Sequence, residues 1–160
     1  TVFMREGVAF RVRLVGIDTQ QLVAGAAARK AHLRWIDSVL ASAREEWIVV
    51  IGHHPVYAHG HYGNTPVLVK QLAPLFEKYG VNAYLNGHEH DLQLMRRING
   101  VRYVVSGGGG GVRKTSTGPN TEFAASTLGF FRLDFDEKQL RIRAFDADGK
   151  LLHEAADPRK

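Results

Sequence analysis

Histidines gather in two short segments of the chain, and imidazole is a side chain that both binds metals and carries protons near neutral pH. Most of the eight histidines lie within residues 53–61 and 88–90. His53 and His88 each follow a glycine, which allows a sharp turn of the backbone, and His90 comes two residues after His88. Imidazole nitrogens suit Zn, Fe and Mn. We therefore predict that His53, His88 and His90 bind metal.

Each histidine segment follows a short apolar run that predicts a buried strand. Residues 47–51 and residues 81–85 are the two runs, and the amphipathic residues 65–80 predict one helix between them. Parallel strands on either side of one helix end at the same edge of a sheet, which is where ligands bind in open α/β sheets. The three histidines are therefore expected to converge there.

The rest of the chain predicts further strands and a helix around this unit. Residues 8–18 predict a strand that enters the core, and residues 28–43 predict an amphipathic helix. After residue 91, alternating apolar residues and tight turns predict an antiparallel run of strands at residues 92–98, 101–106, 128–135, 140–145 and 151–153. This order is typical of a mixed α/β sheet with helices on its faces.

Composition excludes several classes of protein. The chain has 160 residues, 44% of them apolar and 23% charged, which is ordinary for a folded domain. It has no cysteine, so disulfides and thiolate ligands are excluded. The net charge of +5 comes from scattered basic residues rather than a stripe, and no apolar run is long enough to cross a membrane. We therefore expect no nucleic-acid partner and no membrane partner.

Two motifs resemble one family of enzymes. Residues 50–57, Val-Ile-Gly-His-His-Pro-Val-Tyr, and residues 84–93, Tyr-Leu-Asn-Gly-His-Glu-His-Asp-Leu-Gln, resemble the calcineurin-like metallophosphoesterase superfamily. Within it the chain is most similar to purple acid phosphatases of the short, tartrate-resistant type, and the similarity also takes in Gly16-Ile17-Asp18-Thr19. The resemblance implies an α/β fold, a mixed β-sandwich flanked by helices. It also implies a two-metal centre, Fe with Fe, Zn or Mn, that hydrolyses phosphate esters.

The resemblance assigns His53 and His88 to one metal ion and His90 to the other. The remaining ligands of that family come from an N-terminal half with the motifs Gly-Asp-x-Gly, Gly-Asp-Asn-x-x-Tyr and Gly-Asn-His-Asp/Glu, and none of these is present here. We therefore expect residues 1–160 to be the C-terminal half of one metallophosphoesterase domain. We expect two partners, a phosphate-ester substrate and either the missing N-terminal half or a companion chain. Without that half or companion chain, the 160-residue chain would be inactive. The chain itself gives no localisation, although the related enzymes are often secreted or periplasmic.

The loop after His53 offers candidates for the acid that protonates the leaving group. Counting without gaps places Tyr62 where short members of the family carry a histidine, with His61 one residue earlier. His61 is our first choice for this catalytic role and His59 our second. The alternative for both is a solvated loop histidine, because geometry must support a proton-transfer role.

Neighbouring residues are assigned supporting roles. His54 and Glu89 are each expected to point away from the adjacent ligand, with His54 structural or orienting. Asp91 either orients an imidazole or is an exposed loop carboxylate. Asp18 is expected to cap a turn.

A run of five glycines, residues 107–111, predicts a mobile loop that borders the active site. Arg113 and Lys114 follow it, and they either meet a substrate anion or are simply exposed charges.

Three hypotheses follow for function. The first is a dinuclear metallophosphoesterase with acid-phosphatase-like activity on phosphomonoesters. The second is a non-catalytic metal-binding fragment that lacks the bridging carboxylates. The third is a basic interaction domain with incidental histidines.

Overall fold

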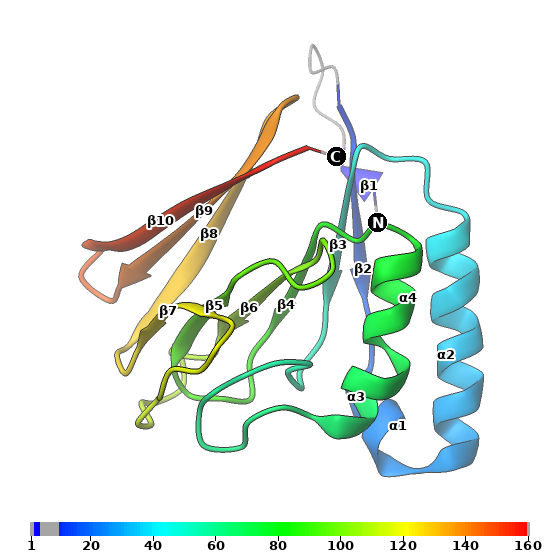
Figure 1. Ribbon diagram of the computed structural model, residues 1–160, viewed down its shortest axis with the longest axis horizontal. Coiled ribbons are helices and arrows are strands. Elements are labelled where there is room, and N and C mark those ends of the chain that lie inside the picture. Colours follow the sequence, from blue (N-terminus) through cyan, green and yellow to red (C-terminus); the bar gives the residue numbers. More distant parts are fainter. Residues whose placement is uncertain (1, 4–9, 160) are drawn as a thin grey trace.

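The computed structural model describes residues 2–3 and 10–159, which form two β-sheets with helices on one side (Figure 1). The larger sheet is mixed and has the strand order β1-β2-β3-β4-β6-β5-β7. Its strands are β1 (Val2–Phe3), β2 (Val12–Gly16), β3 (Trp47–Ile51), β4 (Ala83–Asn86), β5 (Leu92–Met95), β6 (Arg102–Ser106) and β7 (Thr121–Ala125). The smaller sheet is antiparallel, with the order β10-β9-β8, and consists of β8 (Gly129–Phe135), β9 (Gln139–Asp146) and β10 (Leu151–Pro158). The helices are α1 (Thr19–Ala24), α2 (Ala26–Ala41), α3 (Pro66–Gln71) and α4 (Ala73–Lys78).

The strands that lead to the histidines are parallel neighbours. β2 pairs with β3, β3 with β4, and β4 with β6, all in parallel. The connection from β3 to β4 passes through α3 and α4, so both strands end at the same edge of the sheet. The predicted arrangement of residues 47–51 and 81–85 is therefore confirmed.

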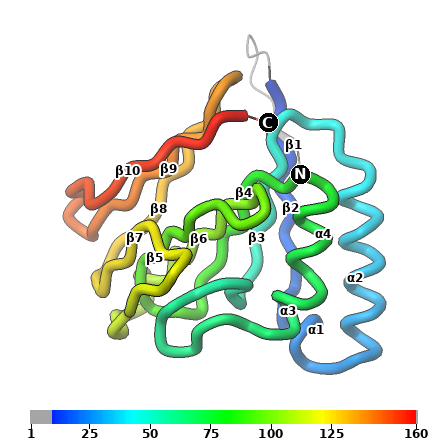
Figure 2. The backbone as a smooth tube through the Cα atoms, in the orientation of Figure 1, coloured from blue at the N-terminus to red at the C-terminus, as the bar shows by residue number. Residues whose placement is uncertain are grey.

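The molecule has three layers, which are the helices, the larger sheet and the smaller sheet (Figure 2). A hydrophobic core lies between each pair of neighbouring layers, the first between the helices and the larger sheet and the second between the two sheets. Side chains of β3 alternate between them: Ile48 and Val50 join the first core, while Trp47 joins the second. Trp47 packs edge-on against Phe135 of β8. The predicted sandwich with flanking helices is confirmed.

Several predicted boundaries differ from the structure. The single helix expected over residues 65–80 is two helices, because Pro74 lacks an N–H for the helical ladder and its ring crowds the preceding turn. Helix α1 was not predicted. Asp18 caps its first turn, as expected for that residue, because its Oδ1 accepts a 2.9 Å hydrogen bond from the Gln20 N–H. Strand β7 was not predicted either. Of the strand predicted at residues 8–18, β2 is observed, and residues 8–9 lie outside the described part.

No helix in the described part of the chain combines the length and the apolar character needed to cross a bilayer.

Candidate metal centre

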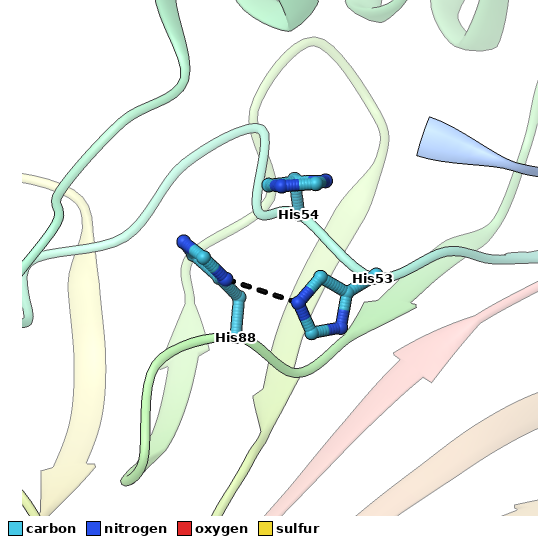
Figure 3. Close-up of side chains that lie close together, drawn as sticks. All are labelled: His53, His54 and His88. Carbon is cyan, nitrogen blue, oxygen red and sulfur yellow. Dashed lines mark hydrogen bonds between the residues drawn. The ribbon is translucent and has the colours of Figure 1, made fainter. Parts of the chain in front are cut away.

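Three histidines meet at the shared edge of β3 and β4 (Figure 3). His53 lies two residues after the end of β3 and is followed by His54, and His88 lies two residues after the end of β4. Each offers a ring nitrogen, and these nitrogens all lie within 4.8 Å of one another. The closest pair is His53 Nε2 and His88 Nδ1, which share a 3.0 Å hydrogen bond.

Thr19, the first residue of α1, holds the turn that carries His53 and His54. Its buried Oγ1 accepts hydrogen bonds from the N–H groups of His53 (3.2 Å) and His54 (3.0 Å) and lies 2.9 Å from His54 Nδ1. Gly52 is required here, because a Cβ would lie 2.4 Å from the Tyr84 hydroxyl. The sequence analysis missed Thr19, although it belongs to the segment Gly16-Ile17-Asp18-Thr19 that resembles the family.

The position of His54 corrects the sequence interpretation. Strand alternation predicts that it points away from His53, but its ring centroid lies 4.9 Å from that of His53 and 4.7 Å from that of His88. The reason is local: the chain has already left β3, and the hydrogen bonds to Thr19 fold the two residues into a turn. The alternation rule applies only within a strand.

His90 lies beside this group rather than in it. Among the described residues, the group of ligand atoms consists of His53, His54 and His88. His90 Nδ1 faces Gly111, at 3.3 Å from the place where a Cβ of that glycine would lie. The structure therefore brings two of the three predicted ligands together and adds His54 to them.

His88 has a backbone conformation that side chains normally avoid. Its φ is 65°, in the left-handed region. For a residue with a Cβ this conformation costs about 1–2 kcal/mol. Such outliers cluster at functional sites, where the surrounding structure maintains the strain. The strain at His88 is an independent sign that its position serves function.

We expect His88→Gly to be more stable than His88→Ala by about 1 kcal/mol, because only glycine relieves the left-handed strain. Urea unfolding of the two variants measures this difference. Asn99, with φ of 48°, is the matched control away from the histidines, and Asn99→Gly should likewise exceed Asn99→Ala. Equal stabilities at position 88 but not at position 99 would show that His88 is not strained.

Two of the imidazoles have pKa values below the usual value for histidine. Burial lowers the pKa of His54 from its usual value, and the neighbouring His88 and His53 lower it further. Burial also lowers the pKa of His88, again with a contribution from His53. Neutral imidazole has the lone pair that a metal ion needs. The lowered pKa values of His54 and His88 therefore favour the form of these two side chains that binds metal.

Tyr62 and His61 lie next to the cluster. The Tyr62 ring stacks on His88 with a centroid distance of 4.3 Å, and His61 packs edge-on against Tyr62 at 4.7 Å. Both side chains are exposed, and that of Tyr62 is 51% accessible. His59 is more enclosed: a Cβ on Gly118 would collide with its ring.

Two buried acidic residues hold this loop, which sequence reasoning did not foresee. Glu89 is 0% exposed, and its Oε1 accepts hydrogen bonds from the N–H groups of Tyr62 (2.6 Å) and Gly63 (2.8 Å). Asp91 is also buried and accepts a 2.8 Å hydrogen bond from Gln93 Nε2. Asp91 is therefore not an exposed carboxylate, and its side-chain hydrogen-bond partners are Gln93 and Thr115 rather than an imidazole.

The donor set fits one metal ion. Three imidazole nitrogens are suitable ligands for Zn or a similar ion. In the part of the chain that the structure describes, no carboxylate belongs to the group. A pair of adjacent ions needs bridging ligands, which would have to come from outside these residues.

Comparisons with known proteins agree with this geometry. The model of the calcineurin-like phosphoesterase family matches residues 4–92, more than half of the chain. The chain belongs to this family. It is 38% identical over 143 residues to human tartrate-resistant acid phosphatase type 5, covering 82% of this chain and 43% of that protein. It is 32% identical over 131 residues to purple acid phosphatase 17 of Arabidopsis thaliana, covering 78% of this chain and 39% of that protein.

Solved structures show the same fold. A purple acid phosphatase from yellow lupin seeds superposes with a TM-score of 0.77 at 20% identity, covering 99% of this chain and 33% of that one. GAP50, the anchor in the inner membrane complex of Plasmodium, superposes with a TM-score of 0.89 at 19% identity, covering 100% of this chain and 53% of that one. The chain thus spans about two fifths of the length of the curated relatives it matches. The family resemblance seen in the sequence is confirmed.

A separate groove of about 470 Å³ lies between α2 and the α3–α4 pair, away from the histidines. Its lining residues are Ala26, Arg29, Lys30, Leu33, Arg34, Asp37, Gln71 and Leu75. It contains no histidine, so the chemistry of the family does not map onto it.

Proposed function

We propose that this chain is the C-terminal half of a metal-dependent phosphoesterase domain that hydrolyses phosphomonoesters when its N-terminal half is supplied. The observation that carries the proposal is the group of three imidazoles at the carboxyl ends of β3 and β4, in a chain that belongs to a phosphoesterase family. Acid-phosphatase-like activity follows from the similarity to tartrate-resistant enzymes.

In this proposal His53 and His88 hold one metal ion, and His90 belongs to a second ion completed by the other half. Fe with Fe, Zn or Mn is the expected pair. Bound metal supplies Lewis acidity that stabilises charge on a phosphoryl group. The position of His54 makes it the third donor for the first ion in the chain as it stands.

The roles of the other residues follow from their contacts. Tyr62 covers His88 and limits the access of water from that side. His61 remains our first choice as the acid that protonates the leaving oxygen, since it is exposed beside Tyr62 at the rim of the cluster. His59 is the weaker choice, because its ring is enclosed by Gly118.

A non-catalytic metal-binding fragment is the second candidate. It is favoured by one observation: the group of ligand atoms in the described residues includes no carboxylate to bridge two ions. Under this hypothesis the chain binds an ion and hydrolyses nothing, whatever is added to it.

The two candidates are separated by an assay of para-nitrophenyl phosphate hydrolysis with and without the upstream segment of the same polypeptide. We expect no turnover by the 160-residue chain alone and turnover by the joined protein. His61→Ala should then lower kcat by about 10²–10⁴-fold, and His59→Ala much less. A joined protein that binds two metal ions and has no activity would establish the non-catalytic hypothesis.

A further inference from the structure

The glycine-rich loop, residues 107–118, is hydrogen-bonded to both histidine segments. The N–H of Gly107 donates to the carbonyl of Asp91 (3.0 Å), that of Arg113 to the carbonyl of His90 (2.7 Å), and that of Ser116 to the carbonyl of His59 (3.1 Å). The backbone of Arg113 is thus fixed next to the metal-binding segment. The loop borders the site, as the sequence predicted.

The side chain of Arg113 lies over the Tyr62 ring, next to the histidine cluster. Its guanidinium carbon is 5.1 Å from the centroid of the Tyr62 ring, and that ring stacks on His88. A positive charge therefore stands close to the cluster.

The charge and the donors of Arg113 are available to a ligand. Its guanidinium makes no ion pair and no hydrogen bond with any side chain in residues 10–159. The contact with the Tyr62 ring orients the guanidinium and leaves its N–H donors unused. The nearby acidic side chains bind other groups through one oxygen each: Glu89 Oε1 accepts backbone N–H groups and Asp91 Oδ2 accepts from Gln93. Their second oxygens are buried and make no hydrogen bond to Arg113. A guanidinium presents a planar fork of donors that matches two phosphate oxygens.

We propose that Arg113, held over Tyr62, binds the anionic phosphate group and makes the site favour dianionic monoesters over monoanionic diesters. This inference rests on the proposed function and identifies the residue of the same site that selects among phosphate esters. A monoester dianion has three terminal oxygens and two negative charges, whereas a diester has two terminal oxygens and one negative charge. The guanidinium fork can contact two oxygens of either ester, so Arg113 favours the monoester through its greater charge. Arg113 is thus a specificity-determining residue, and Tyr62 is its positioning residue.

Binding of inorganic phosphate to the 160-residue chain tests the inference without turnover. The probe is titrated at constant ionic strength while the Arg113 Nε–H signal is followed by ¹H–¹⁵N NMR. We expect a saturable shift, about tenfold weaker phosphate binding in Arg113→Gln, and a smaller loss in Arg113→Lys, which keeps the charge but not the fork. Lys114→Gln, the matched control at the next cation, should leave the affinity unchanged.

Equal losses in Arg113→Gln and Lys114→Gln would overturn the inference, since they would indicate only a diffuse positive field. In the joined protein, Arg113→Gln should raise the KM for a monoester about tenfold and raise that for bis-para-nitrophenyl phosphate less, so that the preference for the monoester falls. Phosphate binding at Arg113 in a joined protein that lacks activity would refute the proposed function alone. Normal hydrolysis with unchanged monoester preference in Arg113→Gln would refute this inference alone.

Discussion

Metal retained by the purified chain is expected to be lost when His53 or His88 is replaced by alanine. The ring nitrogens of these residues are already 3.0 Å apart, so one ion can contact both with little rearrangement. Loss of groups that merely orient ligands lowers metal affinity about 10–100-fold, so loss of a ligand should exceed that range. Mass spectrometry of metal content after dialysis, followed by calorimetric titration with Zn²⁺, measures the effect.

His54 and His90 distinguish two possible ligand sets. In the isolated chain, His54→Ala should lower Zn²⁺ affinity nearly as much as His53→Ala, because His54 lies in the same group of nitrogens. His90→Ala should have a small effect, since that ring faces Gly111. The opposite ranking would mean that the metal draws His90 into the site and releases His54.

Two controls accompany this series. His61→Ala keeps the three nitrogens and should retain the metal ion. Thr19→Val removes the hydroxyl 2.9 Å from His54 Nδ1 and should lower affinity by about tenfold through the orientation of that ring. Metal retention in His53→Ala and His88→Ala alike would contradict a site at this edge of the sheet.

The edge where the site forms was predictable, because it depends on patterns within short segments. Residues 47–51 and 81–85 are apolar runs that end before Gly-His, and β3 and β4 are indeed parallel neighbours. The split between α3 and α4 was also readable in principle, since Pro74 lies inside the predicted helix. The prediction of one helix rested on the apolar spacing alone and did not take this proline into account.

The ligand-orienting contacts were not predictable from a single sequence. Thr19 and His54 are 35 residues apart, and Glu89 holds Tyr62 across 27 residues, so nothing local indicates either contact. Alternation placed His54 on the wrong side, because it follows the end of a strand rather than lying within one. For Glu89 it gave a direction but no partner. Such contacts depend on how the loops pack in three dimensions.

Breaking the buried ion pair between the two sheets should have the largest effect on stability. Arg102 of β6 is 5% exposed, and its guanidinium donates two hydrogen bonds to Asp157 of β10, one of them 2.8 Å long. It also pairs with Glu122 of β7 and donates to the carbonyl of Met95 (2.9 Å). Asp157→Ala leaves a buried charge without its main partner, so we expect a loss of about 3–5 kcal/mol in urea unfolding.

The control for this pair is Arg132 with Asp134 in β8, where the arginine side chain is 59% exposed. Asp134 also pairs with Arg143, so the control variant is Arg132→Met, with an expected cost below about 1 kcal/mol. The double variant Arg102→Met/Asp157→Leu should recover much of the lost stability, because apolar residues of similar volume can replace a buried pair. A loss in Asp157→Ala as small as that in Arg132→Met would mean that the pair is effectively solvated.

The same variants separate stability from the site. Arg102 lies at the start of β6, whereas the glycine-rich loop follows the other end of that strand, and the histidines follow β3 and β4. The Asp157→Ala variant should therefore retain metal at temperatures where it is still folded. The His53→Ala variant should lose metal while its free energy of unfolding changes little. Loss of metal from folded Asp157→Ala would show instead that the distance between the sheets controls the geometry of the histidines.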